Sequence, residues 1–256
     1  MGGRVTGGWR SSARLVGDWA AAGRDLVFPP SCAACRANLD RHEERLCERC
    51  RDLLSPGIAD RCRRCSAPVG PHLDTALGCV HCRGEKWKLR RVFSLGPYAE
   101  RLREACLRLK RPGSEPLAAA LAEELYAARA DEWARERYDL VVPVPHHWRH
   151  RLWRTQLVPV ALARTLGRRL HLPVQMHLVR KAKFTPQQAT LSATERRLNL
   201  RSAFAPIGGT RLLGGRILVV DDVLTTGTTA DRVARVLLEL GAESVDAAVI
   251  ARGLGQ

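Results

Sequence analysis

The stretch Ile217-Leu-Val-Val-Asp-Asp-Val-Leu-Thr-Thr-Gly-Thr-Thr229 joins an aliphatic run, two acids and a hydroxyl-rich turn. The run 217–220 is typical of a short strand buried on both faces. Asp221 and Asp222 follow where that strand would end, which is where open α/β sheets bind their ligands. The next five residues offer hydroxyls and N–H groups at the start of a predicted helix, which suits a phosphate. They are Thr225, Thr226, Gly227, Thr228 and Thr229. The pattern predicts a site for a ligand such as ribose 5-phosphate.

This stretch resembles the phosphoribosyl-diphosphate (PRPP) signature of type I phosphoribosyltransferases. The resemblance implies that Asp221 and Asp222 are the catalytic acids that hold the ribose hydroxyls, while the Thr/Gly loop wraps the 5-phosphate. The alternative is an ordinary strand, turn and helix in which the Asp and Thr residues only cap the helix. Two adjacent acids followed by Thr-Thr-Gly-Thr-Thr favour the binding site.

Eight of the nine cysteines form four Cys-x-x-Cys knuckles. Two knuckles about a dozen residues apart are typical of a tetrahedral four-cysteine zinc site, and the sequence offers that spacing twice. We expect two structural zinc ions, the first two knuckles on one ion and the last two on the other, with a crossed pairing left open. The knuckles are Cys32/Cys35, Cys47/Cys50, Cys62/Cys65 and Cys79/Cys82.

Disulfides and redox pairs are the alternatives to zinc. Disulfides need an oxidising compartment, and we find no secretory signal pattern near the N-terminus. A redox motif would occur once, whereas this motif occurs four times. The ninth cysteine, Cys106, is expected to be a buried small apolar residue.

The chain is expected to contain an N-terminal segment, 1–28, as a helix or flexible stretch, and then two modules. The small module, 29–88, has few long apolar runs, so metal should replace its missing core. The larger module, 90–256, alternates helices and strands, which predicts an α/β fold with a parallel sheet and helices on both faces. Ser114 is the expected cap of its second helix and Gly241 the stop of its last. Helices are expected over 98–110, 114–138, 159–170 and 228–240, and strands over 139–142, 174–179, 217–221 and 245–251.

Two polar stretches are candidate parts of the same site. Val144 and Pro145, followed by the basic run 146–151, should lie at the sheet edge of Asp221 and offer amides and arginines to a diphosphate. The stretch 180–199 is long, basic and polar, which predicts a lid that excludes water. A basic surface loop and a simple surface excursion are the alternatives. The lid candidates are Thr185, Gln187, Arg196 and Asn199.

The formal net charge is +16. Eight zinc-bound thiolates and two divalent ions would lower it by four, to about +12, which still favours polyanions such as nucleic acid or phosphorylated ligands. The alternative is basic charge spread over a solvated surface. Trp87, Trp148 and Trp153 are candidates for stacking on single-stranded bases, and a packing role is the alternative for each. No apolar run is long enough to span a bilayer, and we expect a cytoplasmic protein.

From about Phe28 onward the chain resembles the ComF family of competence proteins, which join a double zinc ribbon to a type I phosphoribosyltransferase domain. One departure concerns the run after Val144, where the family shows Arg-Gly-Phe/Tyr-Asn-Gln and this chain has Arg154-Thr-Gln-Leu-Val158. The difference bears on the acceptor side of the site. Besides the knuckles, the matching pieces are 28–32, 98–110, 142–145, 185–187, 196–199, 203–204, 219–229 and 251–252.

The resemblance implies PRPP binding with magnesium and a role in natural competence and uptake of single-stranded DNA. It also implies contact with other competence proteins at the inner membrane surface, but it does not supply an acceptor substrate. Three functions stay open: a phosphoribosyltransferase acting on a base, amine or nucleic-acid-linked acceptor, a nucleic-acid-binding competence factor without catalysis, and a PRPP-sensing regulator. Turnover of PRPP would identify the first, and salt-sensitive binding to single strands the second.

Overall fold

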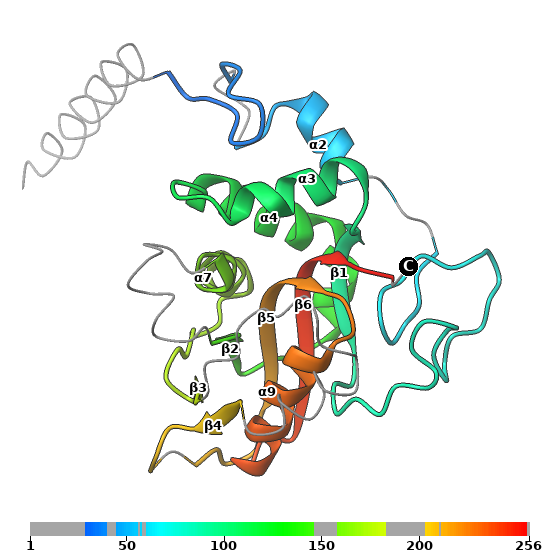
Figure 1. The fold of residues 1–256 in the computed structure, drawn as a ribbon, viewed down its shortest axis with the longest axis vertical. Coiled ribbons are helices and arrows are strands. Elements are labelled where there is room, and N and C mark those ends of the chain that lie inside the picture. The colour runs from blue at the N-terminus through cyan, green and yellow to red at the C-terminus, as the bar shows by residue number, and fades with distance from the viewer. Residues whose placement is uncertain are drawn as a thin grey trace, which may run out of the picture. The chain divides into compact units, whose positions relative to one another are not determined.

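The structure is a computed structural model that describes residues 29–39, 45–55, 57, 60–145, 158–182, 203–209 and 211–254 (Figure 1). The chain forms two compact units, Met1–Cys50 and Arg51–Gln256, so the last two knuckles share a unit with the sheet. The boundary expected near residue 89, between the modules 29–88 and 90–256, stays a prediction. In the described ranges, no helix has the length and apolar character needed to cross a membrane.

The helices are α2 (Glu48–Leu54), α3 (Glu100–Leu109), α4 (Glu115–Ala128), α5 (Ala130–Arg135), α7 (Val158–Leu170) and α9 (Thr228–Glu239). The strands are β1 (Val92–Pro97), β2 (Leu140–Pro143), β3 (Val179–Lys181), β4 (Phe204–Pro206), β5 (Arg216–Leu224) and β6 (Ser244–Arg252).

Four parallel strands form the central sheet in the order β1-β6-β5-β2 (Figure 1). The apolar run that begins β5 is buried, because β6 and β2 pair with it on either side. The register places Pro143 of β2 beside Val220, and Asp221 beside Val249 of β6. The carboxyl ends of the strands therefore meet at one edge, as the sequence predicts.

Helices cover both faces of this sheet. Val233 and Leu237 of α9 share a buried cluster with Ile217 and Val219 of β5. The alternate strand residues, such as Leu218, are buried as well, and α7 contacts β5 while α4 contacts β1. The predicted α/β class is therefore confirmed, and so is the expected stop of α9, because Gly241 follows it in the left-handed region (φ 108°).

Three local predictions need correction. Strand β1 is absent from the expected elements, since Ser94 and Gly96 interrupt its apolar run; Ser94 is buried through hydrogen bonds to Ser66. The strand expected over 174–179 is instead an isolated bridge at Val174 and the short β3, which pairs antiparallel with β4 in a separate sheet. Ser114 precedes α4 but makes no side-chain cap bond there, because its hydroxyl donates to the Leu109 carbonyl (2.7 Å).

The outer edge of β1 is covered by the turn that carries the third knuckle. The N–H of Val92 donates to the Arg64 carbonyl (2.9 Å), and the N–H of Ser94 donates to the Ser66 hydroxyl (3.1 Å). The Arg61 guanidinium donates to the carbonyls of Ser94 and Leu95. Backbone groups of an edge strand that would otherwise face solvent are thus satisfied by the cysteine-rich segment.

Candidate functional site

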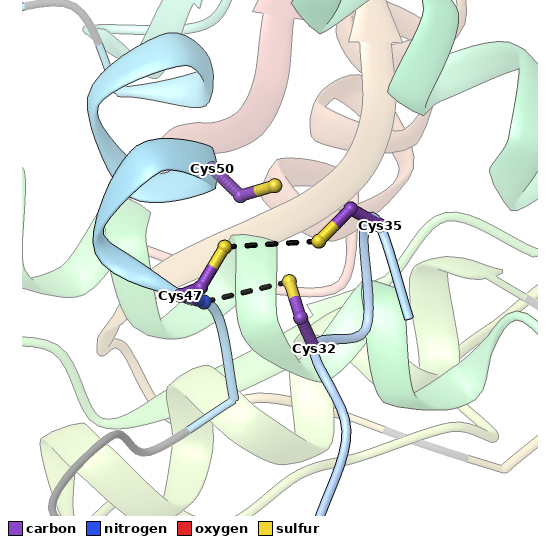
Figure 2. A group of neighbouring side chains, drawn as sticks. All are labelled: Cys32, Cys35, Cys47 and Cys50. Carbon is purple, nitrogen blue, oxygen red and sulfur yellow. Dashed lines mark hydrogen bonds between the residues drawn. The ribbon is translucent and has the colours of Figure 1, made fainter. Parts of the chain in front are cut away.

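The first four knuckle cysteines converge in space. Cys32, Cys35, Cys47 and Cys50 place their sulfurs within 4.8 Å of one another, and Figure 2 shows all four side chains pointing toward a common centre. The Sγ atoms of Cys35 and Cys47 are 3.7 Å apart. The N–H of Cys47 donates to the Cys32 sulfur (3.4 Å), an arrangement that stabilises a thiolate.

The last four knuckle cysteines form an equivalent cluster that is buried throughout. The sulfurs of Cys62 and Cys82 lie 3.7 Å apart, and those of Cys65 and Cys79 lie 3.6 Å apart. Zinc–sulfur bonds of about 2.3 Å in a tetrahedron place sulfurs about 3.8 Å from one another, whereas a disulfide brings them to about 2.05 Å. Both clusters therefore fit a metal and not a disulfide, and each gathers two consecutive knuckles.

One thiol in each cluster is poised to ionise. Burial opposes ionisation of Cys32, yet N–H donors from Cys35, Cys47 and Ala34 lower its pKa to about 6. Burial likewise opposes ionisation of Cys62, and the N–H groups of Cys65 and Arg64 lower its pKa to about 7. Burial raises the pKa of Cys50 and Cys65, so Cys32 and Cys62 are the thiols that ionise more readily in their clusters, and zinc is bound by thiolates.

The hydroxyl-rich loop and Asp221 line one cavity of about 40 Å³, more than the roughly 10–15 Å³ that a water needs. Gly227 caps α9 in the left-handed region (φ 74°). The N-terminus of that helix faces the cavity, because its first residues, Thr228 to Ala230, line it. The Thr226 and Thr228 hydroxyls lie 2.8 Å apart. Helix N–H groups and paired hydroxyls beside a hollow of this size suit one phosphate group. The cavity lining comprises Asp221, Val223, Leu224, Thr225, Thr226, Gly227, Thr228, Thr229, Ala230 and Val249.

The two acids lie within β5, which continues to Leu224, whereas the sequence predicts that this strand ends at Asp221. Neighbouring residues of a strand face opposite sides of the sheet. Asp221 lines the cavity, whereas Asp222 is not among its lining residues. Burial raises the pKa of Cys106 to about 12, and the charge of Asp222 contributes to the rise. Cys106 itself is fully buried, as predicted.

Asp221 is held in a form that resists ionisation. Asp221 is only partly exposed, so its charge is poorly hydrated. Burial raises the pKa of Asp221 well above its usual range, and the charge of Asp222 raises it further. Lys181 of β3 and the N–H of Asp222 act in the opposite direction. Such a carboxyl ionises readily only when a ligand supplies hydrogen bonds or positive charge.

Val144 and Pro145 follow β2 at the same edge of the sheet. The N–H of Val144 donates to the Val220 carbonyl (2.9 Å), so these residues adjoin Asp221 as expected. Residues 146–157 lie outside the described residues. They include the basic run 146–151, Trp148 and Trp153, and all but the last residue of the stretch 154–158 that departs from the family pattern. The four lid candidates, Thr185, Gln187, Arg196 and Asn199, and the N-terminal segment 1–28 also lie outside them.

One contact at the loop involves a residue with no predicted role there. The indole N–H of Trp87, just after the last knuckle, donates to the Thr226 carbonyl (3.1 Å). A Cβ at Gly227 would lie 2.6 Å from the Trp87 ring, so glycine is required both by the backbone conformation and by this contact. Of the two roles open for Trp87, base stacking and packing, the structure shows packing, and the sequence carries no sign of its partner Thr226 because the two residues are 139 positions apart.

Two domain families match this chain. The phosphoribosyl transferase domain matches residues 160–256, and the double zinc ribbon domain matches residues 24–83. The first match contains the cavity and α9, and the second contains all four knuckles. With the parallel sheet and the two cysteine clusters, these matches confirm the predicted combination of a phosphoribosyltransferase-like fold and a double zinc ribbon.

The chain is also similar to whole proteins. It is 29% identical over 227 residues to competence protein F of Haemophilus influenzae, covering 86% of this chain and 96% of that protein. It is 29% identical over 241 residues to DNA utilization protein YhgH of Escherichia coli K12, covering 90% of this chain and all of that protein. Among solved structures, adenine phosphoribosyltransferase from Saccharomyces cerevisiae overlaps 57% of this chain and 72% of its own, at 16% identity and a TM-score of 0.35.

Proposed function

Because this chain belongs to the ComF family, in which a double zinc ribbon is joined to a phosphoribosyltransferase domain, we propose that it binds PRPP. The observation that carries the proposal is the single cavity shared by Asp221 and the Thr225–Thr229 loop. The loop and the N-terminus of α9 receive the 5-phosphate, and the acids accept hydrogen bonds from the ribose hydroxyls. Val144 and Pro145 border the same edge and face the diphosphate side.

The two cysteine clusters are proposed to hold two structural zinc ions. Their sulfur spacing and the low pKa of Cys32 and Cys62 support this, because zinc prefers four thiolates in a tetrahedron. Magnesium is proposed to accompany PRPP, where it neutralises diphosphate charge. Near the loop, Asp221 and Asp222 are the carboxylates proposed to offer it oxygen ligands.

The chemistry that such a site supports is transfer of the ribosyl group from PRPP. The C1–O bond to diphosphate breaks through an oxocarbenium-like state, and a nucleophilic acceptor takes its place. This chain contributes positioning of the ribose and stabilisation of charge. The acceptor is a base, an amine or a nucleic-acid-linked group, and a PRPP-sensing role without transfer is the alternative that the same cavity supports.

The pH dependence of PRPP binding tests the proposal. Ribose hydroxyls donate to an ionised carboxylate, whereas burial and Asp222 keep the pKa of free Asp221 high. Binding should therefore release a proton, and affinity should rise with pH by up to about tenfold per unit until the pH passes that pKa. Calorimetry of magnesium–PRPP in buffers of different ionisation enthalpy measures the proton. An absence of binding, or an affinity independent of pH between about pH 5 and pH 8, would count against it.

A second candidate function is contact with single-stranded DNA, in the cytoplasm and alongside other competence proteins. The observation that favours it is an arginine-lined hollow of about 160 Å³ beside the second cluster. Four guanidinium groups line the hollow beside one carboxylate, that of Glu132, which pairs with Arg91 and Arg129. The four are Arg61, Arg63, Arg91 and Arg129.

DNA binding at this hollow makes a measurable prediction. A fluorescein-labelled oligothymidylate should bind with an affinity that falls steeply with salt, and Arg63→Gln should reduce the slope of log affinity against log salt by about 0.7. Arg111, exposed in the turn after α3, provides the matched control, because Arg111→Gln removes the same charge away from the hollow. Fluorescence anisotropy at several salt concentrations measures the slope. Equal slopes for the two variants would exclude the hollow as the DNA site.

A further inference from the structure

The segment that leaves the second cysteine cluster packs directly on the phosphate loop. Trp87 lies against Gly227 so closely that a methyl group there would overlap its ring, and its N–H bonds the neighbouring Thr226 carbonyl. The ring also packs on the cluster itself, where all four cysteines are buried. One side chain thus contacts both the cysteine cluster and the loop that is proposed to hold a phosphate.

Two arginines reinforce this contact from either end. The Arg64 guanidinium lies 5.8 Å from the centre of the Trp87 ring and donates to the carbonyls of Cys82 (2.8 Å) and Glu85 (2.7 Å). The Arg252 guanidinium lies 5.9 Å from the same ring and donates to the carbonyls of Leu224 (3.1 Å) and Thr225. Arg64 therefore fixes the backbone of a cysteine ligand, Arg252 fixes the backbone of the loop, and both stack on one indole.

The same segment also anchors the helix that follows the loop. The N–H of Lys88 donates to the Asp231 carboxylate (2.6 Å), which lies in the first turn of α9 and is buried. Arg235 bridges that carboxylate (2.8 Å) and the Lys86 carbonyl (2.9 Å). The loop is therefore held at its centre by Trp87 and at its helical end by Asp231, in both cases by residues 86–88.

From these contacts we infer that Trp87 is a positioning residue, through which the second cysteine cluster holds the phosphate loop in its ligand-binding shape. The inference rests on the proposed function, since it assigns the loop to the 5-phosphate of PRPP. Trp87 does not line the cavity, so it acts through Gly227 and Thr226 and not on the ligand. Loss of the cluster or of the indole frees the loop, and phosphate affinity falls because the loop must then be ordered on binding.

Hydrogen exchange of the loop in the full-length protein tests this inference without any ligand. In Trp87→Ala, amides of 224–231 should exchange about tenfold faster, while strands β2 and β6 exchange as before and two zinc ions remain bound. Trp87→Phe keeps an aromatic ring against Gly227 and loses only the N–H donor, so it should restore most of the protection. Unchanged loop exchange in Trp87→Ala would overturn the inference whether or not PRPP binds.

Two neighbouring arginines supply a matched pair of variants for a test of PRPP binding. Arg64→Gln removes the stack on Trp87, whereas Arg63→Gln removes the same charge one residue away, at the arginine-lined hollow. Magnesium–PRPP affinity, measured by calorimetry, should fall about tenfold in Trp87→Ala and severalfold in Arg64→Gln, and should hold in Arg63→Gln. If the unaltered chain binds no PRPP, the proposed function fails while the exchange result still decides the role of Trp87. Equal affinities across all these variants would overturn that role.

Discussion

Replacing Cys79 with serine is expected to remove one of two zinc ions and to lower the unfolding temperature of Arg51–Gln256 by at least about 10 °C. The reason is that the second cluster lies within this unit, buried, and in contact with Trp87 and Leu254. Structural zinc contributes about 10–16 kcal/mol in zinc-finger peptides, as much as the net stability of a typical domain. Metal analysis and differential scanning calorimetry measure the two effects.

The matched control is Cys47→Ser in the first cluster. It should also cost one zinc ion, but it should unfold the ribbon around Cys32 and leave the sheet nearly unchanged, because that cluster belongs to the other compact unit. A serine hydroxyl is a poor replacement for a thiolate ligand, so neither variant should keep both ions. Two ions retained in Cys79→Ser, or equal effects of the two variants on the sheet, would show that the second cluster does not support the fold.

Changing Asp221 and Asp222 together to asparagine is expected to weaken PRPP binding at least about tenfold. Hydrogen bonds to charged groups contribute about 1.5–3 kcal/mol each, and asparagine keeps the shape while removing the charge. Binding of inorganic phosphate or sulfate at Thr225–Thr229 should survive, since that loop uses amides and hydroxyls. Of the single variants, Asp221→Asn should carry the larger loss, because only Asp221 lines the cavity.

The fold of this double variant should remain intact. When folding raises the pKa of a carboxyl group, the folded state loses stability as the pH rises from the pKa of the unfolded chain to the pKa of the folded chain. The pKa of Asp221 is raised in this way, so its ionised form is unfavourable at neutral pH. Asparagine removes that cost. Calorimetric titration with circular dichroism separates the outcomes. Unchanged PRPP affinity in a natively folded variant contradicts the assignment, and loss of both ligands together with structure indicates that the acids only cap the turn.

The sequence predicted those parts of the fold whose signals are local. The aliphatic run before Asp221 and the glycine after α9 each determine a backbone conformation with their own neighbours, and both predictions are confirmed. The knuckle spacing predicted two four-cysteine sites and favoured consecutive knuckles at each, which is confirmed, but a crossed pairing would satisfy a tetrahedral site equally well. The strand was expected to end at Asp221 because a polar pair is typical of a strand end, yet pairing with β6 continues through Leu224.

The remaining features depend on contacts between distant residues. Strand β1 carries Ser94 in its centre, which is stable only because Ser66, 28 positions earlier, bonds it. Strand β3 finds its partner β4 more than twenty positions later, so its pairing has no local signal. The packing of Trp87 on Gly227 is of the same kind, since neither residue type indicates the other. Periodicity describes how a segment meets its own neighbours, and it carries no information on such partners.

The covering of β1 by the third knuckle has a practical consequence for shortened forms of this protein. A chain that begins at residue 90, where the sequence alone would divide the modules, would leave the N–H groups of Val92 and Ser94 without their partners. An uncovered edge strand pairs readily with other chains, so β1 of one molecule could pair with β1 of a second copy. The phosphoribosyltransferase domain would therefore tend to aggregate when isolated, so its solubility is encoded in residues that precede it.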